Sequence, residues 1–494
     1  MSDVFDGEWH QLEFKATLAV LVFVLVPLPV TLLIMLVAGA GAIPTLITTG
    51  IWLVVTALIA GAGYYEWHFT RYRVTGERFE FRRGGVFRSH RSIPRERIRA
   101  VDVTANPVER ILRIAKVKVS TGGQGSEGEI RLDAINRSDA EQVRADLILR
   151  TAPDPDADSD GVLAKLNPVW LLYSALTLSL MLVVWGAIGS LVGNFQQMLS
   201  SWGVWTQVGA AVTALGLVLF ALLSAAGVLM IGVVGAVLLS AEMWWGYQLT
   251  REPAGTLRVT RGLLTNRSLS LEERRLRGVE LAEPLLLRWF RGARLNAVAT
   301  GINSTQGNDQ KKQPDRKTLL PPAPRSEALR VSRKTLRHNP FGTALRTHSG
   351  RALRRRINWA LFAVLPVLLA AAVPAWLGWF PVWAVMLVTA AAAAVGLAFA
   401  FDAYRNLGHG LDEKYLVARN GTGVRKTVAL QRDDIIGWRI SRTVFQRRAN
   451  LMTVGATTAA GSSIYRVHDV DTETGLAVAD EAVPGLLEPF LQRP

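Results

Sequence analysis

The feature that most constrains this chain is a 41-residue segment that occurs twice without a gap and a third time more loosely. Residues 83–123 read RGGVFRSHRSIPRERIRAVDVTANPVERILRIAKVKVSTGG, and residues 261–301 read RGLLTNRSLSLEERRLRGVELAEPLLLRWFRGARLNAVATG. A third copy starts near Asn420 and needs about three residues deleted to stay in register. Because each copy follows a pair of apolar segments, one module is used three times along the chain.

The apolar segments have the length of membrane spans. Half of the residues are hydrophobic, and a helix of ~20 apolar residues crosses ~30 Å of hydrocarbon. Six uncharged stretches occur in three pairs: Thr17–Val37, Ile43–Tyr64, Val169–Val192, Val208–Ala241, Asn358–Leu377 and Val382–Phe401. They predict six transmembrane helices in three hairpins, the first kinked at Pro27 and Pro29 and the fourth tilted, kinked or protruding.

The charges around the hairpins predict their orientation. The three loops that join the paired spans, Ala38–Ala42, Gly193–Gln207 and Gly378–Pro381, contain no Lys or Arg. All basic residues therefore lie on the side of the repeated domains, and the positive-inside bias assigns that side to the cytoplasm. The first span follows an acidic flank, which is untypical of a signal peptide, so we expect it to be retained with both termini inside.

The pattern divides the chain into nine segments. These are an N-terminal segment (1–16), hairpin 1 (17–66), domain 1 (67–150), an acidic linker (151–168), hairpin 2 (169–242), domain 2 (243–340), a basic linker (341–357), hairpin 3 (358–401) and domain 3 (402–494).

Each domain reads as a series of short strands that ends in one helix. In the first copy, alternating apolar and polar residues predict strands at 72–75, 78–82, 87–93, 98–103, 116–120 and 129–134. Ser138 and Glu141 form a capping-box pattern that opens a helix to Leu149. The expected fold is α+β: three helical hairpins alternate with three small barrels or sandwiches, each closed by a C-terminal helix that hides its strand edges.

Three sequence elements recur in the domains. The first is a tyrosine that leads the chain out of each hairpin, at Tyr72, Tyr247 and, less well, Tyr404. The second is an Arg-Gly turn at 83–84 and 261–262. The third is an "I-P-x-x-R-I" strand start at 93–98, which recurs as LEERRL at 271–276 and LQRDDI at 430–435.

With these elements the chain resembles the bacterial pleckstrin-homology-like (bacterial PH domain) membrane family, in its large form with three domains. The resemblance covers nearly the whole chain and implies the architecture rather than an activity. Eukaryotic proteins with the PH fold bind phosphoinositides, but a fold alone does not carry a ligand from one protein to another.

The sequence shows no catalytic, cofactor-binding or metal-binding constellation. It contains no cysteine, and its seven histidines include no pair at metal-ligand spacing, so we interpret them as surface or interfacial residues. The paired carboxylates Glu272-Glu273 and Asp433-Asp434 have arginine neighbours, which favours ion pairs over acid–base catalysis. The glycines at 122–128 lack the Gly-Lys-Ser/Thr ending of a phosphate loop. We therefore expect no enzyme and no cofactor.

The strongest local charge feature precedes the third hairpin. Between Ile302 and Arg356 there are fourteen Lys or Arg and three Asp or Glu. The run ends in Arg351, Arg354, Arg355 and Arg356, next to the span. It is typical of a topogenic stop, and these four arginines are also our candidate lipid-binding residues, since anionic headgroups attract basic residues by ~1 kcal/mol each near the surface. Nothing in the run is suited to reading nucleic acid bases.

These observations favour a non-enzymatic scaffold of the bacterial inner membrane. Its cytoplasmic domains would bind anionic phospholipid or a membrane partner protein, such as a smaller protein of the same family, in envelope maintenance or protection. The alternative is a transporter or channel component with the six-helix bundle as its pathway. The spans carry no charged residue, whereas transport pathways usually need ionisable groups inside the membrane.

Overall fold

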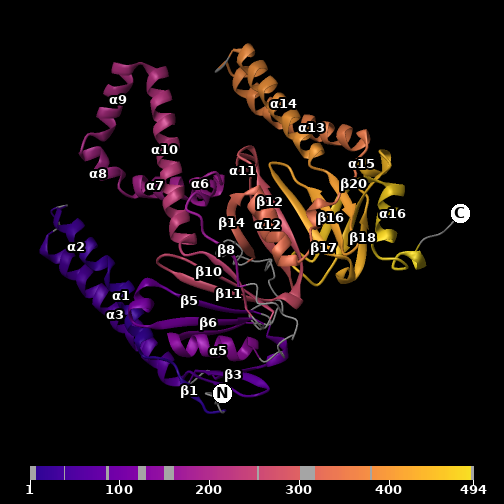
Figure 1. Ribbon diagram of the computed structural model, residues 1–494. Coiled ribbons are helices and arrows are strands. Elements are labelled where there is room, and N and C mark those ends of the chain that lie inside the picture. Colours follow the sequence, from indigo (N-terminus) through magenta and orange to yellow (C-terminus); the bar gives the residue numbers. More distant parts are fainter. Residues whose placement is uncertain are drawn as a thin grey trace. The chain divides into compact units, whose positions relative to one another are not determined.

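The computed structural model describes residues 7–490 except 38, 40, 85–87, 99, 121–128, 150–160, 253–254, 301–316 and 379–380. The glycines at 122–128 and part of the acidic linker therefore lie outside the described residues. The chain forms two compact units (Figure 1). The first contains Met1–Leu166 and Glu242–Arg275, and the second contains Asn167–Ala241, Leu276–Thr300 and Gln313–Pro494. The boundary falls inside the second repeat, between Arg275 and Leu276.

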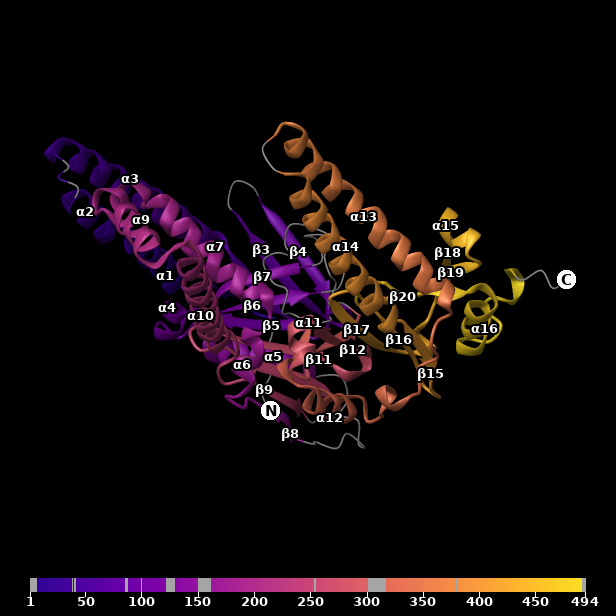
Figure 2. The same cartoon turned by 90° about the horizontal axis from the view of Figure 1, so that it is seen from above.

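Within the described residues, four helices are long and apolar enough to cross a membrane: α3 (Ala42–Phe69), α10 (Leu217–Trp244), α13 (Gly350–Trp376) and α14 (Val382–Arg405). Helices α13 and α14 run side by side as one hairpin (Figure 2). They correspond to four of the six predicted spans, and the other two are shorter than predicted.

The two shorter spans are interrupted for local reasons. The first divides at Val26 into α1 (Lys15–Leu25) and α2 (Pro27–Val37), as the prolines predicted, because proline lacks the backbone donor of a continuous helix. The third divides into α6 (Trp170–Ala175) and α7 (Leu178–Asn194) at Thr177, which has an extended backbone.

The long fourth segment also breaks. After α8 (Gln196–Ser201), helix α9 (Val204–Leu215) ends at Gly216, whose φ of 75° lies outside the helical region, and α10 begins at the next residue. Glycine adopts this backbone without steric cost.

The first repeat is a two-layer sandwich with a helix. Strands β1 (His10–Gln11), β2 (Arg71–Val74), β3 (Arg78–Arg83) and β4 (Ser89–Pro94) form one antiparallel sheet in that order. Strands β5 (Ala100–Ala105), β6 (Ile114–Ser120) and β7 (Glu129–Asn136) belong to the other sheet. Helix α5 (Arg137–Leu149) begins one residue before the predicted Ser138 cap.

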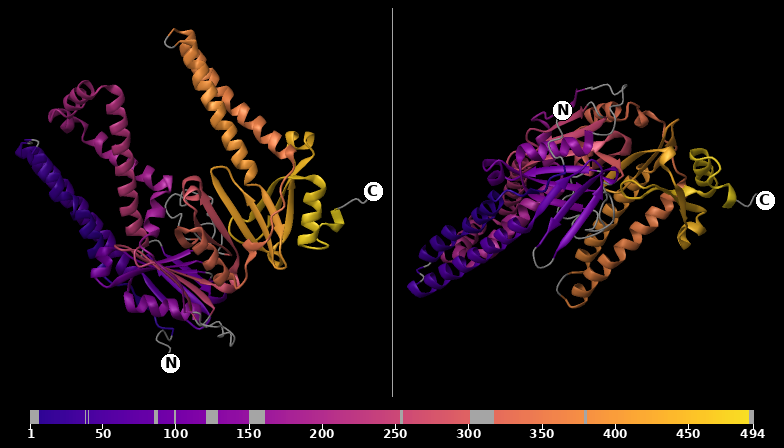
Figure 3. Two further views of the ribbon diagram at one scale, coloured as in Figure 1. Left: turned by 45° about the horizontal axis from the view of Figure 1, so that its top comes forward. Right: turned by 90° about the horizontal axis from the view of Figure 1, so that it is seen from below.

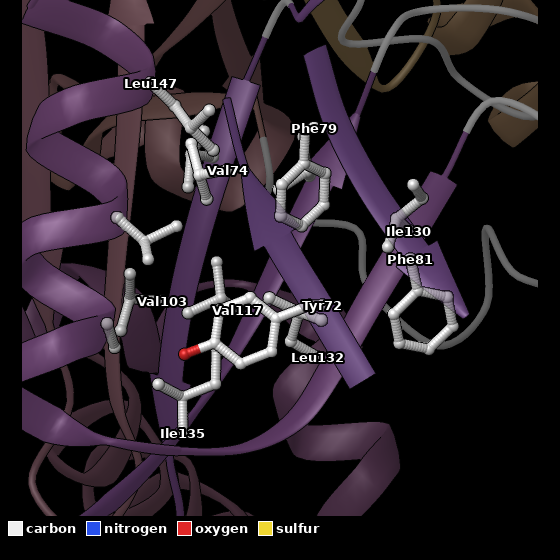
Figure 4. Packing of buried hydrophobic residues seen from close by; sticks show 14 of the residues in the cluster. Tyr72, Val74, Phe79, Phe81, Val103, Val117, Ile130, Leu132, Ile135 and Leu147 are labelled. Carbon is white, nitrogen blue, oxygen red and sulfur yellow. The ribbon is translucent and has the colours of Figure 1, made fainter. Parts of the chain in front are cut away.

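Apolar residues of both sheets and of α5 form the core (Figure 4). Tyr72 and Phe79 of the first sheet meet Val117 and Leu132 of the second, and Leu147 of α5 lies at the edge of the same cluster. The alternating pattern of the sequence is the reason, because successive residues of a strand point to opposite faces.

The sequence predicted sheets that close within each repeat. In the structure, the sheets instead continue into the next repeat. One seven-stranded sheet runs β7-β6-β5-β11-β10-β9-β8. Its last four strands come from or before the second repeat: β8 (Gly161–Lys165), β9 (Gln248–Glu252), β10 (Thr256–Arg261) and β11 (Asn266–Glu272). Strand β5 thus has β11 as its second neighbour.

The second unit repeats this arrangement. A six-stranded sheet runs β14-β13-β12-β17-β16-β15, with β12 (Leu276–Pro284), β13 (Gly292–Ala299) and β14 (Thr318–Pro324) from the second repeat. Strands β15 (Gly408–Leu411), β16 (Tyr415–Asn420) and β17 (Val424–Gln431) come from the third. Helix α12 (Arg325–Leu336) closes the second repeat.

The third repeat ends in a separate three-stranded sheet of β18 (Gly437–Ser441), β19 (Leu451–Thr457) and β20 (Ile464–Asp471), with α16 (Thr472–Ala482) packed against it (Figure 3). Three short helices, which the sequence did not predict, occupy the same place in the three repeats: α4 (Pro107–Ile111) follows β5, α11 (Leu285–Trp289) follows β12 and α15 (Val444–Arg448) follows β18. When the segment that precedes each hairpin (β1, β8 and the bridge residue Arg346) is counted as first, β5, β12 and β18 are the fifth strands of their repeats.

Each hairpin is inserted between two neighbouring strands. Strand β1 precedes hairpin 1 and pairs with β2, which follows it. Strand β8 precedes hairpin 2 and pairs with β9, and Arg346 precedes hairpin 3 and bridges to His409 of β15. The segments interpreted from the sequence as an N-terminal tail and linkers therefore contribute to the sheets.

The glycines of α10 give a testable account of helix packing in hairpin 2. A Cβ atom added to Gly232 would lie 2.9 Å from Trp185 Nε1, and one added to Gly235 would lie 2.7 Å from Val184 Cγ1. We expect Gly232→Leu to destabilise hairpin 2, because α7 and α10 could no longer approach closely. The apparent thermal unfolding midpoint of the detergent-purified protein should fall by several degrees.

Gly227 on the same helix is the matched control. A Cβ atom there meets nothing within 4 Å, so Gly227→Leu should leave the midpoint unchanged. Equal effects of the two substitutions would show that the contact with Trp185 is unimportant.

Candidate membrane-facing site

The four candidate arginines lie on the first two turns of α13, and the structure divides them into two pairs. Arg355 and Arg356 both donate hydrogen bonds to the carboxylate of Asp469, at the end of β20. Asp469 is 1% exposed and also accepts a hydrogen bond from Gln446 Nε2 at 2.9 Å. Arg351 and Arg354 are exposed, and Arg351 lies 3.8 Å from Asp471.

Because they pair with the buried carboxylate of Asp469, Arg355 and Arg356 stabilise the folded structure. A buried carboxylate with two guanidinium partners is strongly destabilised when its partners are removed, because the remaining charge has lost both water and counter-charge. Arg351 and Arg354 lie at exposed positions next to the apolar part of α13, with Arg351 also within ion-pair distance of Asp471. They are the part of the candidate set that is accessible to a headgroup.

The three short helices form a second recurring element. Each is followed by a residue with a left-handed backbone: Arg113, Arg291 and Asn450. Each also exposes large apolar side chains, namely Ile111 near α4, Trp289 and Phe290 near α11, and Val444 and Phe445 on α15. The RWFR sequence at 288–291, with two aromatic residues between arginines, was the available signal for this element.

The short helices lie at the bases of the hairpins. Helix α4 packs against α1. In the second unit, Arg288 of α11 forms an ion pair with Asp402 and donates to Asn406 Oδ1 at 3.0 Å, at the C-terminal end of α14. The ring of Phe445 lies 6.1 Å from that of Trp359 on α13.

Exposed apolar side chains beside arginines at the end of a span suit the membrane–water interface. Aromatic rings are enriched at headgroup depth, and long basic side chains extend from there to phosphates. Each unit therefore has its own candidate membrane-facing site: α4 in the first unit, and α11, α15, Arg351 and Arg354 in the second.

The acidic residue that closes each hairpin is part of the same region. Glu66 forms an ion pair with Arg83, the last residue of β3, at 2.6 Å. The carbonyl of Glu242 accepts a hydrogen bond from the amide of Leu263 in the β10–β11 turn, and Asp402 binds Arg288 of α11. These contacts hold the C-terminal ends of α3, α10 and α14.

Two histidines are buried, whereas the sequence predicted that all seven lie at the surface or at an interface. His348, just before α13, and His409 of β15 are buried, with perpendicular rings whose centroids lie 5.1 Å apart. Burial, together with the neighbouring His409 and Arg356 and against Asp469 and Asp471, lowers the pKa of His348 to about 4. Burial and the neighbouring Arg346 lower the pKa of His409 to about 4. Both rings are therefore neutral at pH 7.

The remaining candidates from the sequence are the paired carboxylates at 272–273 and 433–434. Glu272 pairs with Arg275 at 2.7 Å, Glu273 with Arg251 at 2.5 Å, and Asp434 with Arg277 at 2.7 Å. The ion-pair interpretation is therefore confirmed for these three carboxylates, although only Glu272 pairs with an arginine near it in the sequence. Burial raises the pKa of the Asp434 carboxyl, and Arg277 opposes that shift. Among the described residues no group of three or more His, Asp or Glu is placed to hold a metal ion.

Apolar hairpins inserted into two-sheet domains with a closing helix define a membrane protein built from PH-like modules. The comparisons agree with this class. The family model of the bacterial PH domain matches residues 18–151 and 360–483, more than half of the chain. The chain therefore belongs to the bacterial PH domain family.

A relative with a similar length supports the assignment. The chain is 21% identical over 462 residues to the UPF0699 transmembrane protein YdbT of Bacillus subtilis (strain 168), covering 86% of this chain and 85% of that one. No solved structure matches. The second repeat lies between the two matched segments, and its strands nevertheless follow the same order.

The buried histidines predict a pH dependence of stability. Their folded pKa values of about 4 lie below the ordinary 6.5, so between pH 6.5 and 4 the unfolded chain binds protons that the folded chain does not. Stability should therefore fall as the pH is lowered through this window. We expect a smaller fall in the apparent unfolding midpoint from pH 7.5 to pH 5 for His348→Gln/His409→Gln than for the wild type.

His90→Gln is the control, since His90 is exposed on β4. This variant should show the pH dependence of the wild type. A double variant with an unaltered slope would mean that other groups dominate acid destabilisation.

Proposed function

We propose that the protein is a non-enzymatic scaffold of the bacterial inner membrane whose PH-like domains face the cytoplasm and bind anionic phospholipid headgroups. The observation that carries the proposal is the threefold recurrence of one arrangement. In each repeat, a short helix at the base of a hairpin presents exposed apolar side chains beside arginine: α4 lies at hairpin 1, and α11 and α15 lie at hairpin 3. One such element would bind a membrane weakly, whereas three elements in one chain act together.

The electrostatics support lipid as the ligand. The net charge is +16, and the loops between the paired spans have no Lys or Arg, so the positive charge lies on one side of the membrane. An anionic leaflet attracts such a surface, and each basic residue near it contributes ~1 kcal/mol before screening. Nucleic acid is not part of the proposal, because the arginines in question lie at the ends of apolar helices.

A protein partner is the second part of the proposal. Six spans and the cytoplasmic orientation are predictions from the sequence pattern, and a partner from the same family is part of this proposal. The family assignment supports a membrane role. No enzyme activity is proposed, since the described carboxylates and arginines near the hairpin bases are paired with each other rather than arranged around a cleft.

The lipid proposal is tested by separating the two arginine pairs. Arg351→Gln/Arg354→Gln should lower the share of anionic phospholipid that co-purifies with the protein, measured by mass spectrometry, without lowering the unfolding midpoint. Only charges within about a Debye length of ~8 Å should count at physiological salt. Arg355→Gln/Arg356→Gln should mainly lower stability, because Asp469 would lose its partners.

Arg333→Gln/Lys334→Gln on α12 removes the same charge from the closing helix of the second repeat and is the matched control. If the anionic share is the same for the Arg351/Arg354 variant and the wild type, these arginines are not a lipid site and keep only their topogenic role.

The orientation is tested with single cysteines in the cysteine-free chain. A cysteine in place of exposed Ser201, at the end of α8, should react with an impermeant maleimide on whole cells. A cysteine in place of exposed Ser462, in the β19–β20 turn, should react only after lysis. Labelling at position 462 in intact cells would reverse the proposed orientation.

A further inference from the structure

The repeats are joined twice by the same strand pairing in the same register. In the first joint, β11 of repeat 2 lies antiparallel to β5 of repeat 1, with Leu271 opposite Ala100. In the second joint, β17 of repeat 3 lies antiparallel to β12 of repeat 2, with Leu430 opposite Gly278. Leu271 and Leu430 occupy one position of the repeated sequence, and Ala100 and Gly278 occupy another. In both joints, the fifth strand of one repeat thus pairs with the fourth strand of the next.

An arginine of the short helix accompanies each joint. Arg110 of α4 donates to the carbonyl of Leu263, in the β10–β11 turn of the following repeat. Arg288 of α11, at the same repeat position, binds Asp402 at the hairpin base of the following repeat. A joint therefore consists of a strand ladder and an arginine that contacts the next module.

The third repeat has the same joint elements but no following repeat. Strand β18, its fifth strand, is the edge of the last sheet among the described residues. Its outer half, Arg439, Ile440 and Ser441, is exposed. Arg447 of α15 corresponds to Arg110 and Arg288 and is exposed, with no side-chain partner in the part of the chain that the structure describes. An exposed edge strand with free backbone groups is a template for another strand.

We propose that β18 and Arg447 form a docking surface for a fourth PH-like module, supplied by a separate membrane polypeptide. The fourth strand of that partner would pair antiparallel with β18 in the register of the two internal joints. A carboxylate or a carbonyl at its hairpin base would accept Arg447, as Asp402 accepts Arg288. This inference deepens the scaffold role, on which it rests, by assigning the surface that holds a partner.

The charges on β18 favour a partner other than a second copy of this chain. Strand β4 is an edge strand too, but the register of the joints would place its Arg91 opposite Arg439. Like charges directly opposite destabilise an antiparallel pair. In the internal joints, the corresponding pairs are Leu269 with Asp102 and Val428 with Glu280. The partner's fourth strand should therefore carry a carboxylate opposite Arg439.

A charge-swap experiment tests this with the chain itself as the probe. Two differently tagged full-length chains are co-expressed, one with Ser441→Cys and the other with Ser89→Cys, two positions that the register places opposite each other. We expect little disulfide between the chains under mild oxidation of membranes. Arg91→Glu in the Ser89→Cys chain turns β4 into the proposed acidic partner, and the cross-link should rise on the order of fivefold.

Single and combined charge substitutions distinguish an effect of charge from the effect of a misfolded variant. Arg439→Glu alone, in the Ser441→Cys chain, should raise the cross-link in the same way, whereas the two Glu substitutions together should return it to the low level. Thr104→Cys/Arg267→Cys within one chain is the positive control, since these residues are paired in the first joint. Ser92→Cys with Ser441→Cys is out of register and should not cross-link.

Two outcomes would overturn parts of the proposal. No cross-link from either single Glu substitution, with the positive control formed, overturns the docking surface. Strong cross-linking of the chains with native Arg91 and Arg439 would identify a second copy as the occupant and overturn the acidic partner. Because the lipid measurement uses other residues, a negative result here leaves the lipid proposal standing, and a negative lipid result leaves this surface standing.

Discussion

The hydrogen-bonded ladder between the fifth strand of one repeat and the fourth strand of the next is the interaction on which the arrangement of this protein depends. A small two-sheet domain that does not close leaves a strand edge with unpaired backbone groups. Here β5 and β12 lie inside seven- and six-stranded sheets, because the next repeat supplies β11 and β17. The compact units consequently follow the shared sheets, and their boundary falls inside the second repeat.

The hairpin bases set the other constraint. Each hairpin is inserted between two adjacent strands, so its two ends must remain at the spacing of neighbouring strands, which is ~4.8 Å. The acidic residues Glu66, Glu242 and Asp402 stand where α3, α10 and α14 leave the apolar region, and each is held by a side chain or an amide of the domain. The C-terminal ends of α3, α10 and α14 are thereby held by neighbouring residues of the domains.

Local patterns were enough to predict the strands and closing helices, because alternation and capping depend on neighbours in sequence. The short helices α4, α11 and α15 were not predicted from the sequence, since five residues are too few to show a helical period. The sharing of sheets between repeats was not predicted either, because β5 and β11 are far apart in the chain. The same holds for the arginine cluster: Arg356 and its partner Asp469 are 113 residues apart, so the sequence could not separate Arg355 and Arg356 from Arg351 and Arg354.

The second repeat differs from the other two at one position that matters for its integrity. In the first repeat, Arg95 donates to the carbonyls of Thr75 and Asp146, and so ties the first sheet to the C-terminal end of α5. In the third repeat, Arg432 donates in the same way to the carbonyls of Asp412, Glu481 and Ala482.

The second repeat has Glu273 at this position, and its carboxylate pairs with Arg251 of the same first sheet. The backbone contact is retained in all three repeats, since the amides of Arg95, Glu273 and Arg432 donate to Glu77, Gly255 and Lys414. A carboxylate, however, cannot donate to helix carbonyls. The middle repeat thus lacks the arginine that holds its two halves together in the other repeats, and its halves belong to different compact units. Its loss of that arginine is compatible with folding because each half is completed by a neighbouring repeat.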